Sequence, residues 1–258
     1  MRERLLPDIV PISASALERW SRCPREYRNR DLLGLPESNP GPPSDVGNLV
    51  HALLRMVHER GSCKDNAFVD DLLAAHGFCG PGPIPGFLER HARRCPSPTD
   101  RSWHEVELAR FHRAPAPMFM ATGRLDAVWI HDGLLDIRDY KTGGVHLERV
   151  GDDPRARLQA WLAAPRAARD GLRIRVRYEH LAAEVGDDPD PYEPEPDEID
   201  GVEEELRTFV EAVRAEVDFA GVHDTGVCGG CRYRGVCPDT AVTSAPTWPE
   251  PPAPDEGG

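Results

Sequence analysis

The sequence has no run of about eighteen apolar residues, and no continuous apolar stretch follows its first arginines. The first absence excludes a transmembrane helix, and the second argues against a signal peptide. We therefore expect a cytoplasmic protein with no membrane partner. In that reducing compartment the seven cysteines are expected to be thiols or metal ligands rather than disulfides.

Basic residues are fewer than acidic ones, and the net charge is −13. Eight acids lie in residues 186–201 and three in residues 241–258, and neither segment contains a base. Removing these eleven charges leaves about −2 for the rest of the chain, so the net charge does not exclude a nucleic-acid partner. Because both segments are rich in proline, we expect a solvated acidic loop over 186–201 and a disordered tail over 241–258.

The first hundred residues predict helices separated by loops. Ser15 followed by Glu18 forms a capping-box pattern, and Pro24 is expected to break the helix after Cys23. A second helix is expected over 45–60, because its apolar residues form one stripe: Val46, Leu49, Val50, Leu53, Leu54 and Val57. Residues 61–100 indicate a short helix near 67–76 and then a loop rich in proline and glycine.

The remainder alternates strands and helices. Strands are expected at "SWHEVELARF", "FMATGRLDAVWI", "LLDIRDYKT" and "LRIRVRYEHLA". A helix carrying "RARLQAWLAAPRAA" precedes the last strand, and a long helix over 201–219 follows it. This order predicts a mixed α/β domain with a central sheet.

Asp132-Gly133, between two apolar strands, predicts a hairpin with a type I′ turn. A two-residue loop pairs His131 with Leu134, and the same register places Asp126 opposite Asp139, with Cβ atoms about 5 Å apart. Lys141 lies on the same face as Asp139. Asp136 has the opposite parity and is not expected to be a ligand.

Two facing carboxylates repel each other unless a cation lies between them. Mg²⁺ suits this pair, because it binds one or two carboxylates together with water and phosphate oxygens. Lys141 could then orient or deprotonate an attacking water, or stabilise charge on a phosphate. The alternative is an exposed strand end, in which one aspartate is protonated or paired with Arg124.

The C-terminal region carries a compact thiol cluster, Cys228-x2-Cys231-x5-Cys237, which needs a fourth ligand from elsewhere. Zinc and a [4Fe–4S] cluster both accept four thiolates, and the spacing does not decide between them. Another five potential ligands lie between residues 61 and 100: Cys63, Cys79, Cys95, His76 and His91. Their spacings match no familiar zinc pattern, so we expect buried or incidental thiols there.

Together these segments resemble the PD-(D/E)XK nuclease superfamily. The core motif is "GRLDAVWIHDGLLDIRDYKTG", with Asp139-Tyr140-Lys141 as its D-x-K element, and it is similar in particular to RecB-like and AddB-like nuclease domains. The resemblance extends in order to "SASALERWSRCPREYRNRDLLGLPE", "GNLVHALLRMVHE", "RLQAWLAA" and "CGGCRYRGVC". It implies a restriction-endonuclease-like fold, with a mixed central sheet flanked by helices. One RecB-like nuclease domain would cover residues 1–240, with an insert at 61–100.

The resemblance also implies roles for single residues. His51, which lies off the apolar stripe of its helix, matches a metal ligand, so His51, Asp126 and Asp139 would hold Mg²⁺ or Mn²⁺. Asp126, Asp139, Lys141 and Gln159 would form the catalytic set. The family often has a tyrosine four residues after this glutamine, and here that position is Ala163. This departure concerns strand guidance or the usual DNA contact, and not metal binding.

Two residues of the preceding strand, Glu105 and Glu107, are equal candidates for a further acid that is common in the family. Strand alternation is expected to place both on one face. For His58 we expect an ordinary surface histidine.

The resembling nucleases also join one N-terminal cysteine to three C-terminal ones around a [4Fe–4S] cluster. Cys23, within "SRCPREY", matches the N-terminal one. The cluster would be held by Cys23, Cys228, Cys231 and Cys237. It would staple the N-terminal helical region to the C-terminal one by closing a long loop.

Arginines on two segments are candidates for contacts with the phosphate backbone of DNA. Arg22 and Arg25 lie on the basic N-terminal helical segment, and Arg173 and Arg175 share one face of a strand. An ordinary solvated face explains the strand arginines equally well. No base-reading motif is present, so we expect no sequence specificity.

The resemblance implies a metal-dependent DNA nuclease, specifically an exonuclease of DNA repair, recombination or CRISPR adaptation that acts on single strands or ends. The sequence has no P-loop pattern, so a helicase or CRISPR adaptation partner would be a separate polypeptide. The alternative is a non-catalytic Fe–S subunit that binds DNA or assists assembly of a helicase–nuclease complex. Ala163 and the low basicity favour this alternative, and the complete D…DxK set opposes it.

Overall fold

The protein is described here by a computed structural model that covers residues 8–38, 45–60, 63–96, 102–113, 116–143, 148–183 and 188–241. The chain divides into two compact units. Residues 1–17 and 44–216 form the sheet unit, and residues 18–43 and 217–258 form the cysteine unit. No helix in the described ranges is long and apolar enough to cross a membrane.

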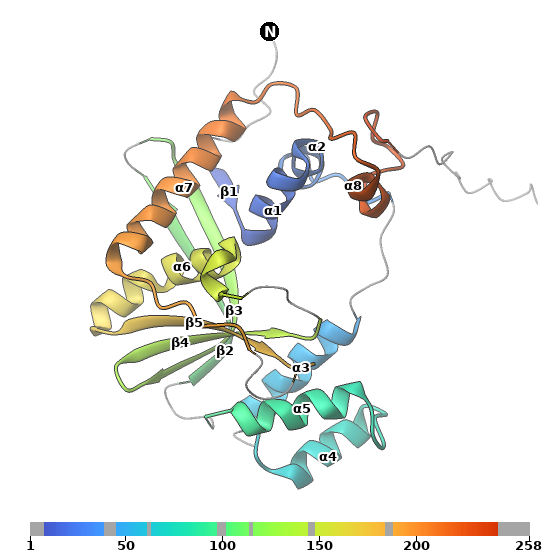
Figure 1. Ribbon diagram of the computed structural model, residues 1–258, viewed down its shortest axis with the longest axis vertical. Helices are drawn as coiled ribbons and strands as arrows, with labels where there is room; N and C mark the ends of the chain where they lie inside the picture. Colours follow the sequence, from blue (N-terminus) through green and yellow to red (C-terminus); the bar gives the residue numbers. More distant parts are fainter. Residues whose placement is uncertain are drawn as a thin grey trace, which may run out of the picture. The chain divides into compact units, whose positions relative to one another are not determined.

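A five-stranded mixed sheet is the centre of the sheet unit (Figure 1). Its strands are β1 (Val10–Ile12), β2 (Ser102–His112), β3 (Phe119–His131), β4 (Leu134–Lys141) and β5 (Arg173–His180). Strand β2 runs antiparallel along one edge of β3. The other edge of β3 pairs with β1 at residues 119–121 and with β4 at residues 127–131. Between these two stretches, among the described residues, 122–126 have no strand partner on that edge.

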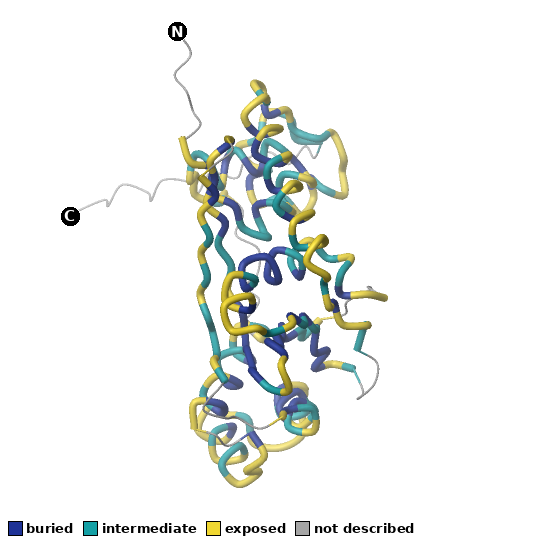
Figure 2. Tube along the Cα trace, turned by 90° about the vertical axis from the view of Figure 1, so that its left-hand side faces the viewer, coloured by how far each residue is buried: buried dark blue, intermediate teal, exposed yellow. Residues whose placement is uncertain are grey.

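Helices cover both faces of the sheet, which confirms the expected mixed α/β class. The helices on one face are α3 (Asp45–Glu59), α4 (Asn66–Ala75) and α5 (Pro83–Arg94). The other face packs against α6 (Pro154–Asp170), and α7 (Pro196–Ala215) in turn packs against α6. Residues of β3 alternate accordingly, with Ala127 and Trp129 in the first core and Val128 in the second. Buried residues follow the strands and the inner sides of the helices (Figure 2).

The cysteine unit is built from the end of α1 (Ala14–Arg22), α2 (Pro24–Tyr27), a π-helical turn (Arg28–Leu32) and α8 (Thr225–Gly230). Trp20 lies between Tyr27 and Phe219, with edge-on ring centroids 5.5 and 6.0 Å away. The Tyr233 hydroxyl donates to the Leu35 carbonyl at 3.1 Å. Aromatic packing therefore joins the two sequence segments of this unit.

Several helix ends differ from the sequence expectations. The hydroxyl of Ser13, not that of Ser15, accepts the Ala16 N–H, so Ser13 caps α1. Helix α2 begins at Pro24, as expected from the break there. Helix α7 begins at Pro196 rather than near residue 201, because Glu195 and Glu198 form a capping box inside the acidic segment. The expected disordered tail lies outside the described residues beyond position 241.

Burial around α3 and α5 corrects three further expectations. Val46, placed on the apolar stripe of α3, is 47% exposed. His58, expected at the surface, is only 3% exposed. The expected loop after residue 76 contains helix α5, whose Pro83 and Pro85 lie in the first turn, where a helix needs no backbone N–H donor.

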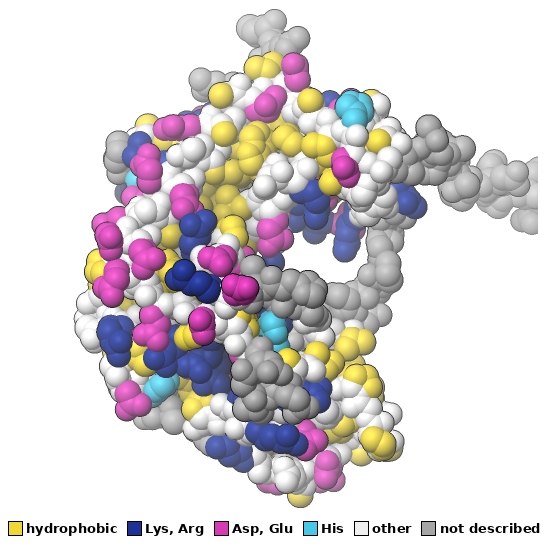
Figure 3. Space-filling model, viewed as in Figure 1, with side chains coloured by type: hydrophobic (Ala, Val, Ile, Leu, Met, Phe, Trp, Pro, Cys, Tyr) yellow, Lys and Arg dark blue, Asp and Glu magenta, His cyan; other side chains and the backbone are white. Residues whose placement is uncertain are grey.

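The four arginines predicted to contact DNA each have an acidic partner. Arg22 lies 2.6 Å from Glu26 and Arg25 lies 2.8 Å from Asp239. Glu193 lies 2.6 Å from Arg175 and 3.5 Å from Arg173. Basic and acidic side chains are likewise interspersed on the face drawn in Figure 3. Phosphate contacts by these arginines stay a prediction, and they would have to compete with the carboxylates.

Candidate functional site

The β3–β4 hairpin has the register that the sequence predicted. Asp132 and Gly133 have φ values of +48° and +72°, as a type I′ turn requires, and the pairing continues from His131↔Leu134 to Ala127↔Arg138. Counted away from the turn, Asp126 and Asp139 lie one position beyond this last pair. The Tyr140 N–H donates to Asp126 Oδ2 at 2.8 Å, so the carboxylate is fixed by the neighbouring strand.

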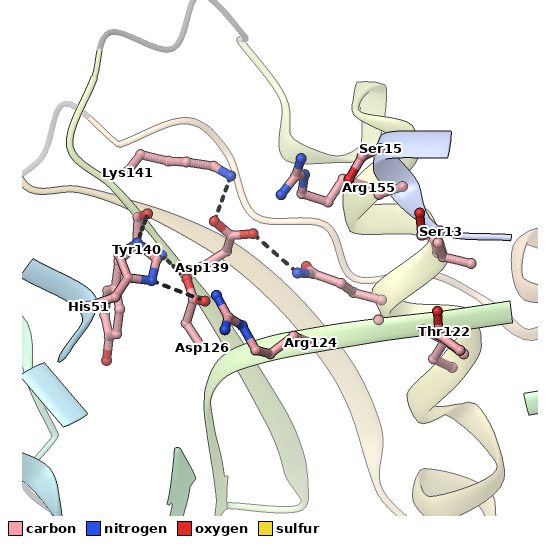
Figure 4. Close-up of a pocket in the computed structure, with 15 residues that line it drawn as sticks. Ser13, Ser15, His51, Thr122, Arg124, Asp126, Asp139, Tyr140, Lys141 and Arg155 are labelled. Carbon is pink, nitrogen blue, oxygen red and sulfur yellow. Dashed lines mark hydrogen bonds and ion pairs between the residues drawn. The ribbon is translucent and has the colours of Figure 1, made fainter. Parts of the chain in front are cut away.

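A cavity of about 350 Å³ lies where β3 has no partner between β1 and β4. Five residues singled out from the sequence line it together: His51, Asp126, Asp139, Lys141 and Gln159. They come from four elements, namely α3, β3, β4 and α6. Figure 4 shows Lys141 directed toward Asp139, and His51 directed toward Asp126.

Asp139 is held from two sides. Lys141 Nζ lies 2.5 Å from its Oδ1, and the Gln159 side-chain amide donates to its Oδ2 at 3.1 Å. Burial raises the pKa of Asp139, and the nearby charge of Asp126 raises it further, while Lys141 opposes both. Lys141 also lies 4.3 Å above the ring of Tyr178. The chain has only two lysines, Lys64 and Lys141, so an ammonium at this position stands out in an arginine-rich sequence.

His51 faces a carboxylate through a nitrogen that carries a lone pair. Its Nε2 lies 3.1 Å from the Tyr140 carbonyl oxygen, which can only accept a hydrogen bond, so Nε2 carries the hydrogen. Neutral His51 then presents the lone pair of Nδ1 to Asp126 Oδ1 at 3.3 Å. Burial lowers the pKa of His51, but Asp126 and Asp139 outweigh it and raise the value. A cation between these two atoms, either a proton or a metal ion, relieves the repulsion.

Glu105 completes a group of three potential metal ligands. Ligand atoms of His51, Glu105 and Asp126 all lie within 4.8 Å of one another. Glu105 has a φ of +52°, an uncommon value for a residue other than glycine, and Arg124 lies 3.0 Å from its carboxylate. Glu107 is exposed and opposite Arg124 in the ladder. Glu105 is therefore the acid nearest to the predicted ligands, and strand alternation could not distinguish it from Glu107.

The cavity also contains polar side chains that the sequence reading did not select. Ser13, Ser15, Arg124 and Arg155 line it, and Figure 4 shows them around the carboxylates. The charge of Arg155 lowers the pKa of Asp139, against the dominant effect of burial. Hydroxyl and guanidinium donors beside carboxylates suit an anionic substrate that bridges to a bound cation. From the sequence, Arg124 is expected only as a partner of an aspartate and Ser15 only in a helix cap, and nothing there marks Ser13 or Arg155.

The four cysteines predicted to form one cluster line a single cavity of the cysteine unit. Cys23 and Cys228 are buried, and burial raises the pKa values of Cys231 and Cys237. The Tyr233 N–H lies 3.4 Å from Cys231 Sγ. Four thiols around one cavity fit a tetrathiolate-bound group, and this donor set suits both zinc and a [4Fe–4S] cluster.

Comparison with known proteins identifies the family of the chain. The model of the PD-(D/E)XK nuclease superfamily matches residues 11–238. A search of curated proteins found no match. Among solved structures, SSO0001 is 14% identical, with a TM-score of 0.40, over 90% of this chain and 88% of its own. A protein from Eubacterium rectale, named for a proposed exonuclease activity, is 9% identical, with a TM-score of 0.45, over 79% and 80%.

Proposed function

We propose that this chain, which belongs to the PD-(D/E)XK nuclease superfamily, is a DNA nuclease that hydrolyses phosphodiester bonds with Mg²⁺ or Mn²⁺. In this proposal His51, Asp126 and Asp139 bind the metal, with Glu105 as a further acid. Lys141 and Gln159 assist the chemistry at Asp139. The observation that carries the proposal is the position of His51 Nδ1, 3.3 Å from Asp126 Oδ1, where a cation between the two atoms would be stabilised.

The donor set fits a hard divalent cation. Two carboxylates and one imidazole converge on one cavity. Two of these ligands, His51 and Asp126, are oriented by backbone groups of the same residue, Tyr140. Its carbonyl fixes the tautomer of His51, and its N–H fixes Asp126. A histidine that ligates a metal commonly donates its other N–H to a carbonyl in this way.

Each side chain then has a separate task. When bound, the metal ion stabilises charge on the phosphate and makes a water more acidic. Gln159 holds Asp139 in position through its amide, and its buried Oε1 has no hydrogen-bond partner among the described residues. Lys141 can exchange its contact with Asp139 for a phosphate oxygen or the attacking water. Arg124 and Arg155 supply positive charge for neighbouring phosphates.

The biological setting of the proposal rests on the sequence resemblance alone. RecB-like and AddB-like similarity supports an exonuclease that acts on single strands or ends in DNA repair, recombination or CRISPR adaptation. A helicase or CRISPR adaptation subunit would be a separate chain, because this sequence lacks a P-loop.

Cleavage of single- and double-stranded DNA with Mn²⁺ tests the mechanism. We expect Asp139→Ala and Lys141→Ala each to lower the rate by about 100-fold or more, since the first removes a metal ligand and the second removes a positive charge that stabilises the reacting phosphate. Asp132→Asn, an exposed change in the turn of the same hairpin, should leave the rate unchanged. Equal activity in all variants would contradict the assignment. Inactivity of the wild type together with DNA binding would favour the non-catalytic subunit.

For the cysteine unit we propose a [4Fe–4S] cluster held by Cys23, Cys228, Cys231 and Cys237, supported by their common cavity. Anaerobically purified protein should contain about four iron and four sulfide per chain. Cys231→Ser should lose most of this iron, whereas exposed Cys79→Ser should retain it. Zinc in place of iron and sulfide would refute the cluster.

A further inference from the structure

A second group of potential metal ligands lies inside the sheet unit, away from the cavity described above. It consists of His58, Cys63, His91 and Cys95, whose exposed fractions are 3%, 2%, 1% and 2%. The Nε2 atoms of the histidines are 2.8 Å apart, and the two Sγ atoms are 3.0 Å apart. Cys95 Sγ lies 3.5 Å from His58 Nε2. Ligand atoms of His58, His91 and Cys95 thus lie within 4.8 Å of one another, and the Cys63 thiol adjoins that of Cys95.

Three segments bring these side chains together. His58 lies in the last turn of α3, and Cys63 lies in the connection to α4. His91 and Cys95 are four residues apart at the end of α5, so both project from the same side of that helix. The sequence spacing gave no zinc pattern, because the ligand pairs depend on how α3 packs against α5. Cys79 is exposed, and His76 Nδ1 lies 2.8 Å from the Leu72 carbonyl, so neither belongs to the group.

A buried carboxylate orients one of the histidines. Glu179 Oε1 lies 2.7 Å from His91 Nδ1, and Glu179 is itself 2% exposed. In neutral His91, with Nδ1 donating to this carboxylate, the lone pair of Nε2 is directed at His58 and Cys95. A carboxylate behind a histidine in this way is a common feature of zinc sites.

We propose that His58, Cys63, His91 and Cys95 bind one structural zinc ion. Two thiolates and two neutral imidazoles balance the charge of Zn²⁺, which makes a buried ion compatible with its surroundings. A tetrahedral zinc with these donors has ligand-to-ligand distances of about 3.3–3.8 Å. The pairs 2.8 and 3.0 Å apart therefore need to separate by less than about 1 Å, and the Cys63 thiol needs to move toward the histidines. Four protein ligands leave no open position, so the ion stabilises the fold and does no chemistry.

The zinc would fasten the region between residues 61 and 96 to the sheet. It would join the end of α3 to the end of α5, and through Glu179 it would contact β5. His51 lies seven residues before His58 on the same helix, so the ion would also fix the helix that carries the predicted metal ligand of the cavity.

Metal analysis of the full-length protein tests the site without reference to DNA cleavage. We expect about one zinc per wild-type chain, and loss of that zinc in Cys95→Ser. Cys79→Ser is the matched control, and it should retain the zinc, as should Asp139→Asn and Cys231→Ser, which alter the two other candidate sites. Cys95→His keeps four ligands and should retain zinc better than Cys95→Ser.

A spectroscopic measurement on the wild type covers the case in which Cys95→Ser fails to fold. Protein produced with Co²⁺ should show the visible absorption of a tetrahedral ion bound by thiolates, and Cys79→Ser should show the same spectrum. The proposal is overturned if the wild type holds no zinc, or if Cys95→Ser retains the zinc. It is likewise overturned by a Cys63–Cys95 disulfide in the intact wild type.

Discussion

Replacing Asp136 with asparagine should destabilise the sheet unit and leave its cavity intact. Asp136 lies on the same strand as Asp139, but it is completely buried and does not line the cavity. Its carboxylate lies 2.9 Å from Arg177 and 3.3 Å from Arg138. Removing one partner from a buried ion pair costs about 3–5 kcal/mol. We expect about 3 kcal/mol in the free energy of unfolding, because Arg138 keeps Glu179 at 3.5 Å and Arg177 is partly exposed.

Thermal unfolding and DNA cleavage, measured on the same preparations, distinguish the structural role of Asp136 from the catalytic role proposed for Asp139. For a unit of this size, about 3 kcal/mol corresponds to a fall in Tm of roughly 6–12 °C. Asp136→Asn should show this fall and still cleave DNA well below its Tm, whereas Asp139→Asn should lose cleavage. The exposed control, Asp132→Asn, should change neither property. A Tm for Asp136→Asn within about 2 °C of wild type would refute the reasoning from burial and charge.

Two further changes test the core and the metal ligands. Leu53→Ala should lower the free energy of unfolding in urea by about 2–5 kcal/mol, because Leu53 is fully buried, while exposed Val46→Ala on the same helix should change it by less than about 0.5 kcal/mol; equal effects would contradict the burial of α3. Glu105→Gln should raise the Mn²⁺ concentration for half-maximal cleavage by about 10-fold, and Glu107→Gln should leave it unchanged; no difference between them would remove Glu105 from the ligand group.

The hairpin could be predicted because every determinant is local. Asp132-Gly133 fixes the turn, the turn fixes the register, and the register carries Asp126 and Asp139 to the same place. Alternation along β4 then places Asp139 toward α6 and Asp136 on the opposite face of the sheet, where it is completely buried. The contacts of Lys141 and Gln159 with Asp139 lie on the face that this register assigns to Asp139.

The features that could not be predicted from the sequence depend on contacts between distant segments. The positive φ of Glu105 has no signal in an alternating strand, and it decides which acid reaches His51. The burial of His58 follows from the packing of α3 against α5, and prolines at the start of α5 had made that segment look like a loop. The ion pairs of Arg173 and Arg175 could not be predicted either, because their partner, Glu193, lies in another segment of the chain.

The division of the chain has a consequence for the order in which the protein is made. The cysteine unit consists of residues 18–43 and 217–258, with most of the sheet unit encoded between them. At about 5–20 residues per second, a ribosome needs roughly ten to forty seconds to travel from residue 43 to Cys237. During that interval Cys23 is a free thiol of the nascent chain, because the three C-terminal cysteines have not all been synthesised. The cysteine unit can therefore be completed only after the sheet unit has been synthesised.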